Sequence, residues 1–128
     1  RFNDGKCAEA MNFYKDCLGG EVEFMTVKDS PMAGEMPDKQ NLVMHSTLKK
    51  EGWTLVGSDM MRDRANVGDN VGVMLSFEDE AEIQSVFAKL SAGGEVFMPL
   101  EVAFWGAWFG VVTDKYGTEW MLNCPKKA

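Results

Sequence analysis

An internal repeat limits the possible folds of this chain more than any other feature. The same four residues, Gly-Gly-Glu-Val, stand at positions 19–22 and 93–96. Each copy follows a segment with the apolar spacing of a helix and precedes a segment typical of a strand. Two repeats of one small unit cannot each bury all of their apolar surface alone. The repeat therefore predicts two similar halves that pack on each other.

The helices of the two halves are predicted from the spacing of their apolar side chains. This spacing indicates a first helix over 7–18 and a second over 80–91. Asp79 and Glu82 have the spacing of a capping box at the start of the second helix. The glycine pairs that follow both segments are typical of helix ends.

Short segments of β-forming residues, separated by turn residues, predict the strands. The expected strands lie at about 21–28, 41–49 and 53–58 in the first half and at about 71–77, 95–98, 108–113 and 118–124 in the second. The first strand of the first half would precede Asn3, where only Arg1 and Phe2 stand. We therefore expect one domain over 1–128, with one βαβββ repeat at about 1–60 and another at about 71–124.

Composition excludes several classes of partner. The 128 residues suit one domain, and 45% hydrophobic with 26% charged residues is ordinary globular composition. Acidic residues outnumber basic ones by 20 to 13, so the net charge of −7 disfavours nucleic acid and anionic membranes. No apolar run approaches the roughly 18 residues of a membrane span. The three cysteines are an odd number without close pairing, which favours free thiols and a cytoplasmic location.

Segments along nearly the whole chain have the order and spacing of a known family. They lie at 2–14, 18–21, 44–45, 57–59, 104–106, 113–117 and 120–124. In these segments the chain resembles the vicinal oxygen chelate superfamily, which includes glyoxalase I, bleomycin-resistance proteins and extradiol dioxygenases, and within it the PhnB-like group. The resemblance implies an α+β glyoxalase-like fold with curved, mostly antiparallel sheets around a cleft. It also implies a homodimer that holds a small molecule in each cup.

The metal ligands of this superfamily have no clear counterparts in the chain. The motif that includes Asp114 and Gly117 places Met121 where the family has a ligand glutamate. A thioether is a poor ligand for hard or borderline divalent ions. The strand around Val73 contains no His, and the whole chain has one. We therefore expect no metal and no other cofactor.

His45 and Glu119 are the polar candidates for a site. A neutral His45 imidazole could act as a general base or orient a ligand. The alternative, a structural His at the rim of the cup or at a dimer edge, is favoured because no partner carboxylate is visible. Glu119 shares a strand face with Met121, so it either points toward the cup mouth or is a solvated carboxylate after a turn.

The aromatic segment 104–109 is a candidate wall for a flat or apolar ligand, because aromatic rings supply large contact area. Trp105, beside Gly106, and Phe109 are the candidates for ligand contact, whereas we expect Trp108 and Trp120 in the core. The ten Met residues suit either an adaptable cavity or ordinary gap-filling in a core.

These residues favour a protein that binds a small, partly apolar molecule without the usual metal triad. The expected ligand contacts are His45, Trp105, Phe109, Glu119 and Met121. The alternative is an enzyme of the superfamily that uses an atypically held metal or the acid-base chemistry of His45 and Glu119, so whether the chain is an enzyme stays open. A purely structural or protein-interaction role is the third possibility.

Overall fold

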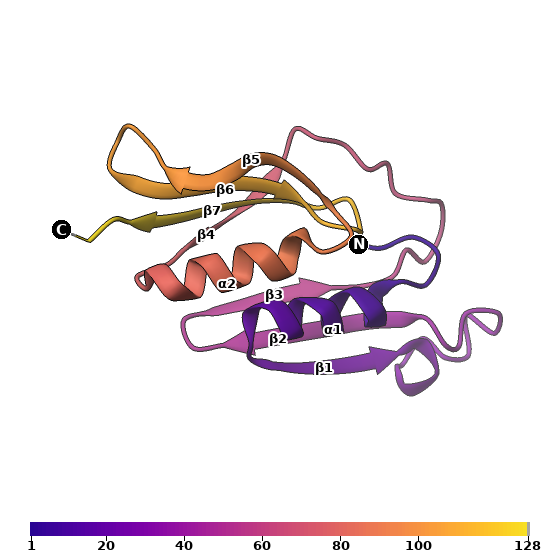
Figure 1. Ribbon diagram of the computed structural model, residues 1–128. Coiled ribbons are helices and arrows are strands. Elements are labelled where there is room, and N and C mark those ends of the chain that lie inside the picture. Colours follow the sequence, from indigo (N-terminus) through magenta and orange to yellow (C-terminus); the bar gives the residue numbers. More distant parts are fainter. Residues whose placement is uncertain (128) are drawn as a thin grey trace. The chain divides into compact units, whose positions relative to one another are not determined.

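The computed structural model describes residues 1–127 and divides the chain into two compact units, 1–66 and 67–128. Each unit contains one long helix on one face of one sheet (Figure 1). In chain order the elements are α1 (Cys7–Leu18), β1 (Glu21–Thr26), the 3-10 helix η1 (Val27–Asp29), β2 (Val43–Lys50), β3 (Trp53–Gly57), β4 (Gly72–Ser76), α2 (Glu80–Ser91), β5 (Glu95–Val102), β6 (Ala107–Thr113) and β7 (Glu119–Pro125). This architecture confirms the predicted α+β class, while the prediction of a single domain over 1–128 stays a prediction.

The first unit contains a sheet in the order β1-β2-β3, with antiparallel neighbours. Phe2 makes an isolated parallel bridge with Asp59, just after β3. The Phe2 amide donates to the Ser58 carbonyl at 2.9 Å, and the Met60 amide donates to the Phe2 carbonyl at 2.8 Å. Residues 1–2 therefore keep the pairing of the first strand of a βαβββ unit, although no strand forms there.

The second unit contains the complete βαβββ arrangement, in the sheet order β4-β7-β6-β5. β4 runs parallel to β7, and the other neighbours are antiparallel. β5 continues to Val102, beyond the predicted end at Met98. Pro99 is tolerated because β5 is an edge strand. The register of β5 against β6 also shifts on both sides of Met98. The prediction ended the strand too early because the edge position is not visible in the sequence.

Both helices bury the apolar stripes that predicted them. The buried residues are Cys7, Ala10, Met11, Tyr14, Cys17 and Leu18 in α1, and Ile83, Val86 and Leu90 in α2. Asp79 caps α2 by accepting a hydrogen bond from the Ala81 amide at 2.9 Å. Each helix covers a single face of its sheet and leaves the other face open. Within 1–127, no helix combines the length and apolarity needed to cross a membrane.

The second glycine of each pair explains why the repeat contains Gly-Gly-Glu-Val. A Cβ atom at Gly20 would lie 2.5 Å from the Lys49 carbonyl oxygen, and one at Gly94 would lie 2.3 Å from that of Thr113. In both units the chain leaves the helix directly against a neighbouring strand. Only glycine permits this close approach of two backbones.

Candidate functional site

The two faces of the second sheet differ in what covers them. Gly110 on β6 faces α2, since a Cβ atom there would lie 2.7 Å from the Phe87 ring of that helix. Its register partner on β7 is Leu122, and side chains alternate along a strand, so Trp120 points the same way. Both side chains are almost completely buried. The open face of the second sheet, opposite α2, therefore carries Glu119, Met121 and Asn123.

A row of apolar side chains crosses this open face. Met121 pairs with Met74 of β4 on one side and with Val111 of β6 on the other. Val111 in turn pairs with Met98 of β5. Directly paired residues place their side chains on the same face of a sheet. Met74 is 53% exposed and Met98 is 43% exposed, so both ends of the row are accessible.

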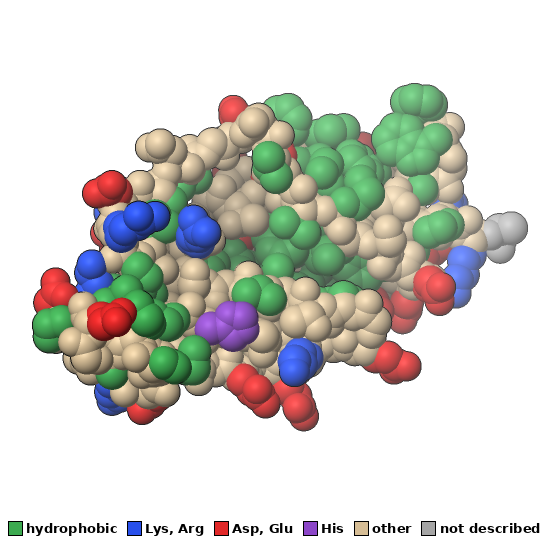
Figure 2. Space-filling model, turned by 180° about the vertical axis from the view of Figure 1, so that it is seen from behind, with side chains coloured by type: hydrophobic (Ala, Val, Ile, Leu, Met, Phe, Trp, Pro, Cys, Tyr) green, Lys and Arg blue, Asp and Glu red, His purple; other side chains and the backbone are tan. Residues whose placement is uncertain are grey.

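Aromatic rings continue the apolar surface toward the turn between β5 and β6. The Trp105 ring lies edge-on to the Phe109 ring at 5.4 Å between centroids, and Phe104 lies edge-on to Trp105 at 4.9 Å. Phe109 pairs with Asn123, which places it on the open face. Trp105 is 51% exposed. Hydrophobic side chains gather over the second unit in the view of Figure 2. The structure therefore brings Trp105, Phe109 and Met121 to one surface.

Trp120 is not part of this surface. Its ring is 1% exposed, and its indole nitrogen donates a hydrogen bond to Asp114 Oδ2 at 2.7 Å. The predicted core position of Trp120 is confirmed. Trp108 is half-buried, and its indole nitrogen is buried. Both rings support the sheet and lie away from the open face.

Glu119 lies at the end of the open face, beside a hollow. It stands between Thr113 of β6 and Gly72 of β4. A Cβ atom at Gly72 would lie 2.8 Å from Glu119 Oε2 and 3.2 Å from the Met121 methyl group, so the missing side chain leaves room for both. The hollow has a volume of about 390 Å³ and is lined by Val67, Gly68, Asp69, Thr113, Gly117 and Glu119.

His45 belongs to the first unit. Its neighbour Ser46 faces α1, because the Ser46 hydroxyl lies 3.5 Å from the thiol of Cys7. His45 therefore points to the open side of the first sheet, where its side chain is exposed (purple in Figure 2). Among residues 1–127 the imidazole has no hydrogen bond or ion pair. His45 and Glu119 thus stand on different units, and their joint acid-base chemistry stays a prediction.

The donor atoms on the open face do not suit the divalent ions that the metalloenzymes of the vicinal oxygen chelate superfamily bind. Val73 pairs with the buried Trp120, so β4 presents Gly72 and Met74 to the open face instead. The nearby donors are the thioethers of Met74 and Met121 and the carboxylate of Glu119. Hard and borderline divalent ions prefer nitrogen and oxygen ligands. In the part of the chain that the structure describes, no three His, Cys, Asp or Glu side chains converge.

Asp59 is a buried carboxylate whose role was not predicted from the sequence. Its side chain is 3% exposed and accepts hydrogen bonds from the amides of Cys7 and Val43, both at 2.8 Å. It therefore caps α1 and holds the start of β2 at the same time. The adjoining thiol of Cys7 is fully buried, and burial raises its pKa above the ordinary value. Cys7 is a packing residue, as its place on the apolar stripe indicated.

Asp114 has the corresponding structural role in the second unit. Its Oδ1 accepts from the amides of Tyr116 and Thr118, at 2.8 and 3.1 Å, while Oδ2 accepts from Trp120. This geometry closes the turn between β6 and β7 and sets the start of β7, which carries Glu119 and Met121. The turn residues that follow Asp114 in the sequence were the feature from which this role could have been predicted.

Comparisons with known proteins agree on the family. Residues 1–122 match the model of the Glyoxalase/Bleomycin resistance protein/Dioxygenase superfamily. The crystal structure of protein PA1353 from Pseudomonas aeruginosa is 35% identical, with 98% of this chain and 93% of that chain covered and a TM-score of 0.87. A PhnB protein from Bacillus cereus is 31% identical, with coverage of 96% and 93% and a TM-score of 0.76. Protein YjdN of Escherichia coli is 26% identical, over 96% of this chain and 90% of its own length.

Proposed function

Because this chain belongs to the glyoxalase/bleomycin resistance protein/dioxygenase superfamily, we propose that it binds a small, partly apolar molecule on the open face of the second sheet. The observation that carries the proposal is the row Met98–Val111–Met121–Met74, which continues into the rings of Phe109 and Trp105. Val111 itself is buried, but Met74, Met98 and Trp105 are exposed, and exposed apolar surface of this kind typically marks a binding site. Thioethers adapt to varied apolar shapes, and aromatic rings supply rigid contact area.

Polar groups at the edges of this face would orient the ligand. Glu119 supplies a carboxylate at the hollow that borders the apolar row, and Asn123 supplies an amide beside Phe109. The predicted contact of His45 with a ligand stays a separate proposal, because His45 belongs to the first unit. Binding then rests on apolar burial and a few hydrogen bonds instead of the usual metal triad. A sequestration or resistance role fits such a site, as the family's bleomycin-resistance members suggest.

An enzyme is the second candidate function. Glu119 beside a hollow and the unpaired imidazole of His45 are groups that could transfer protons. The Bacillus cereus protein carries a proposed 3-demethylubiquinone-9 3-methyltransferase assignment. The present sequence has no glycine-rich adenosyl-binding loop that would support this activity. We therefore place binding first.

The proposal includes a homodimer in the cytoplasm and no nucleic-acid or membrane partner. Phe97 is 75% exposed and Phe104 is 98% exposed, and large exposed apolar side chains suit a surface that a second copy covers. The three cysteines are buried and free, which suits a reducing compartment. Light scattering during gel filtration reports the oligomeric state, and a single-chain mass at micromolar concentration would contradict the dimer.

Native mass spectrometry and elemental analysis of the gently purified protein test the absence of a metal. We expect no stoichiometric divalent ion, and a retained organic molecule would identify the ligand class. One tightly bound divalent ion per chain would move the enzyme hypothesis to first place.

The position of the ligand is tested with an apolar fluorescent probe, 8-anilino-1-naphthalenesulfonate. Met121→Gln places an amide in the centre of the apolar row and should weaken probe binding about tenfold, since burying an unpaired amide costs about 1–3 kcal/mol. Met36→Gln is the matched control, because Met36 is also half-buried but lies in the loop before β2 in the first unit. Equal binding by the two variants would place the ligand elsewhere.

A further inference from the structure

A second hollow is lined only by residues of the first unit. It has a volume of about 280 Å³ and is lined by Arg1, Ser58, Asp59, Met60, Met61 and Arg62. This volume lies just below the roughly 300–1,000 Å³ of typical small-molecule sites, so the hollow suits part of a small molecule. Two of the six lining residues carry a guanidinium group, in a chain whose net charge is −7. With the Asp59 carboxylate counted, the lining side chains keep a net positive charge on an acidic protein.

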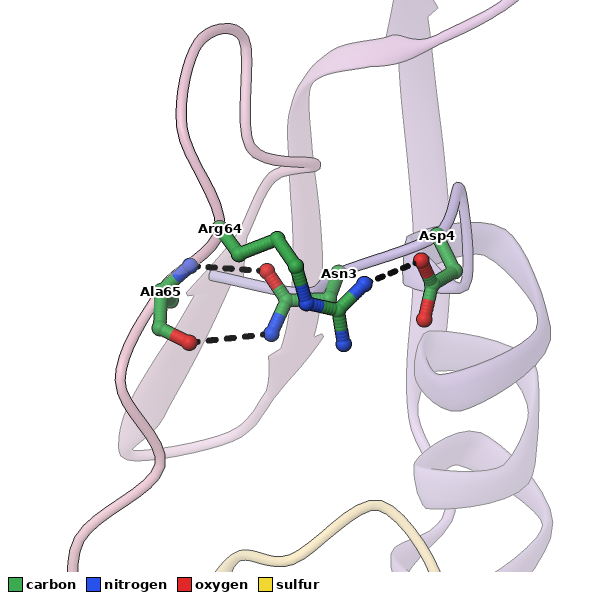
Figure 3. A network of polar contacts seen from close by, with 4 residues as sticks. All are labelled: Asn3, Asp4, Arg64 and Ala65. Carbon is green, nitrogen blue, oxygen red and sulfur yellow. Dashed lines mark hydrogen bonds and ion pairs between the residues drawn. The ribbon is translucent and has the colours of Figure 1, made fainter.

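The backbone around this hollow is held at both ends. The backbone of Phe2 forms hydrogen bonds with the Ser58 carbonyl at 2.9 Å and with the Met60 amide at 2.8 Å. On the other side, the Asn3 amide group forms two hydrogen bonds with the backbone of Ala65, at 3.1 and 2.8 Å (Figure 3). The segment that carries Arg62 is thus tied down before and after it. A site with a fixed frame loses less conformational entropy on binding than a mobile loop does.

The charges around the hollow leave its two arginines available. Both oxygens of Asp59 already accept backbone hydrogen bonds inside the unit. The nearby Arg64 pairs with Asp4 (Figure 3). Arg1 and Arg62, in contrast, make no hydrogen bond or ion pair within residues 1–127. Their guanidinium groups remain free to pair with an external anion.

We propose that this hollow binds the anionic head group of a small organic molecule, a phosphate monoester or a carboxylate. Guanidinium groups bind both through paired N–H donors that match two oxygen acceptors. The Ser58 hydroxyl can donate a further hydrogen bond, and Met60 and Met61 supply apolar contact for the organic part. The site involves only the first unit, so it does not depend on the proposed function of the second sheet.

Isothermal titration of the protein with phenyl phosphate and with benzoate tests this site. We expect saturable, salt-sensitive binding of at least one probe, and the ratio of the two affinities identifies the head group. Arg62→Gln should weaken binding about tenfold or more, because it removes charge-assisted hydrogen bonds. Arg62→Lys should recover part of the affinity, since it restores the charge without the planar fork.

Lys49→Gln is the matched control. It removes the same charge from an exposed position on β2, opposite Thr54 and Glu21, and should leave the affinity unchanged. Circular dichroism confirms that each variant is folded, which we expect because Arg62 and Lys49 are both exposed. The proposal is overturned if the unmodified protein binds neither probe saturably, or if Lys49→Gln weakens binding as much as Arg62→Gln does.

Discussion

Single buried polar side chains position the elements that carry the sites. Asp59 joins the first amide of α1 to the start of β2, and Asp114 holds the turn that leads into β7. A buried carboxylate is tolerated when it accepts several hydrogen bonds, and removing one of them leaves a buried donor unpaired. These two residues carry no proposed ligand contact of their own. Their importance lies in the orientation of the strands beside them.

Asp59→Asn tests this role directly. An asparagine side chain has one acceptor oxygen, so either the Cys7 or the Val43 amide loses its partner, at an expected cost of about 1–3 kcal/mol in the free energy of unfolding. Urea denaturation measures the change. Asp63→Asn, at an exposed position on the same segment, is the control and should be neutral. Equal stability of the two variants would show that the cap contributes nothing.

At the scale of the elements, the helix-to-strand junctions contain the two glycines at which a Cβ atom would meet its neighbour most closely. Both junctions pass a neighbouring strand so closely that a Cβ atom would overlap a carbonyl oxygen. The following strands, β1 and β5, begin one residue later in both units. The shared glycine pair is thus a packing requirement of each junction. It also fixes where the edge strand of each sheet starts.

Alanine substitutions test these junctions. Gly20→Ala and Gly94→Ala should each destabilise the protein by about 1–3 kcal/mol, because the backbone must move to admit the methyl group. Gly34→Ala is the control, since a Cβ atom there would meet nothing within 4 Å. Thermal unfolding of the three variants checks the expectation. A loss for Gly34→Ala as large as that for the other two would refute the packing explanation.

At the scale of the whole molecule, each unit has its own helix, its own sheet and its own hollow. The charged side chains that line the hollow of the first unit are two arginines and Asp59, and those of the second are Asp69 and Glu119. The segment that joins the units, from β3 to β4, contains no helix or strand. Its residues 66–71 are all exposed. It is therefore the part of the chain most open to proteases.

Limited digestion with a Glu- and Asp-specific protease tests the exposure of this segment. We expect the first cut at Asp69, because exposed and irregular backbone fits a protease site with little local unfolding. Glu35 and Asp38 provide the internal control, since their loop is held by turn hydrogen bonds and by two bonds from the Gln40 amide. Mass spectrometry of the first fragments identifies the site, and earlier cleavage at Glu35 would contradict the expectation.

The sequence alone determined the repeat, both helices, the approximate strands and the α+β class, because these depend on local spacing of apolar and turn residues. It also indicated Trp105, Phe109, Glu119 and Met121 as candidates in one repeat, although only the tertiary structure shows that they lie on one face of its sheet. The partners Met74 and Met98 could not be predicted, because strand register decides which residues meet across a sheet. The same holds for the long-range contacts of Asp59 with α1 and of Asn3 with Ala65. Such contacts join residues far apart in the chain, so no local pattern records them.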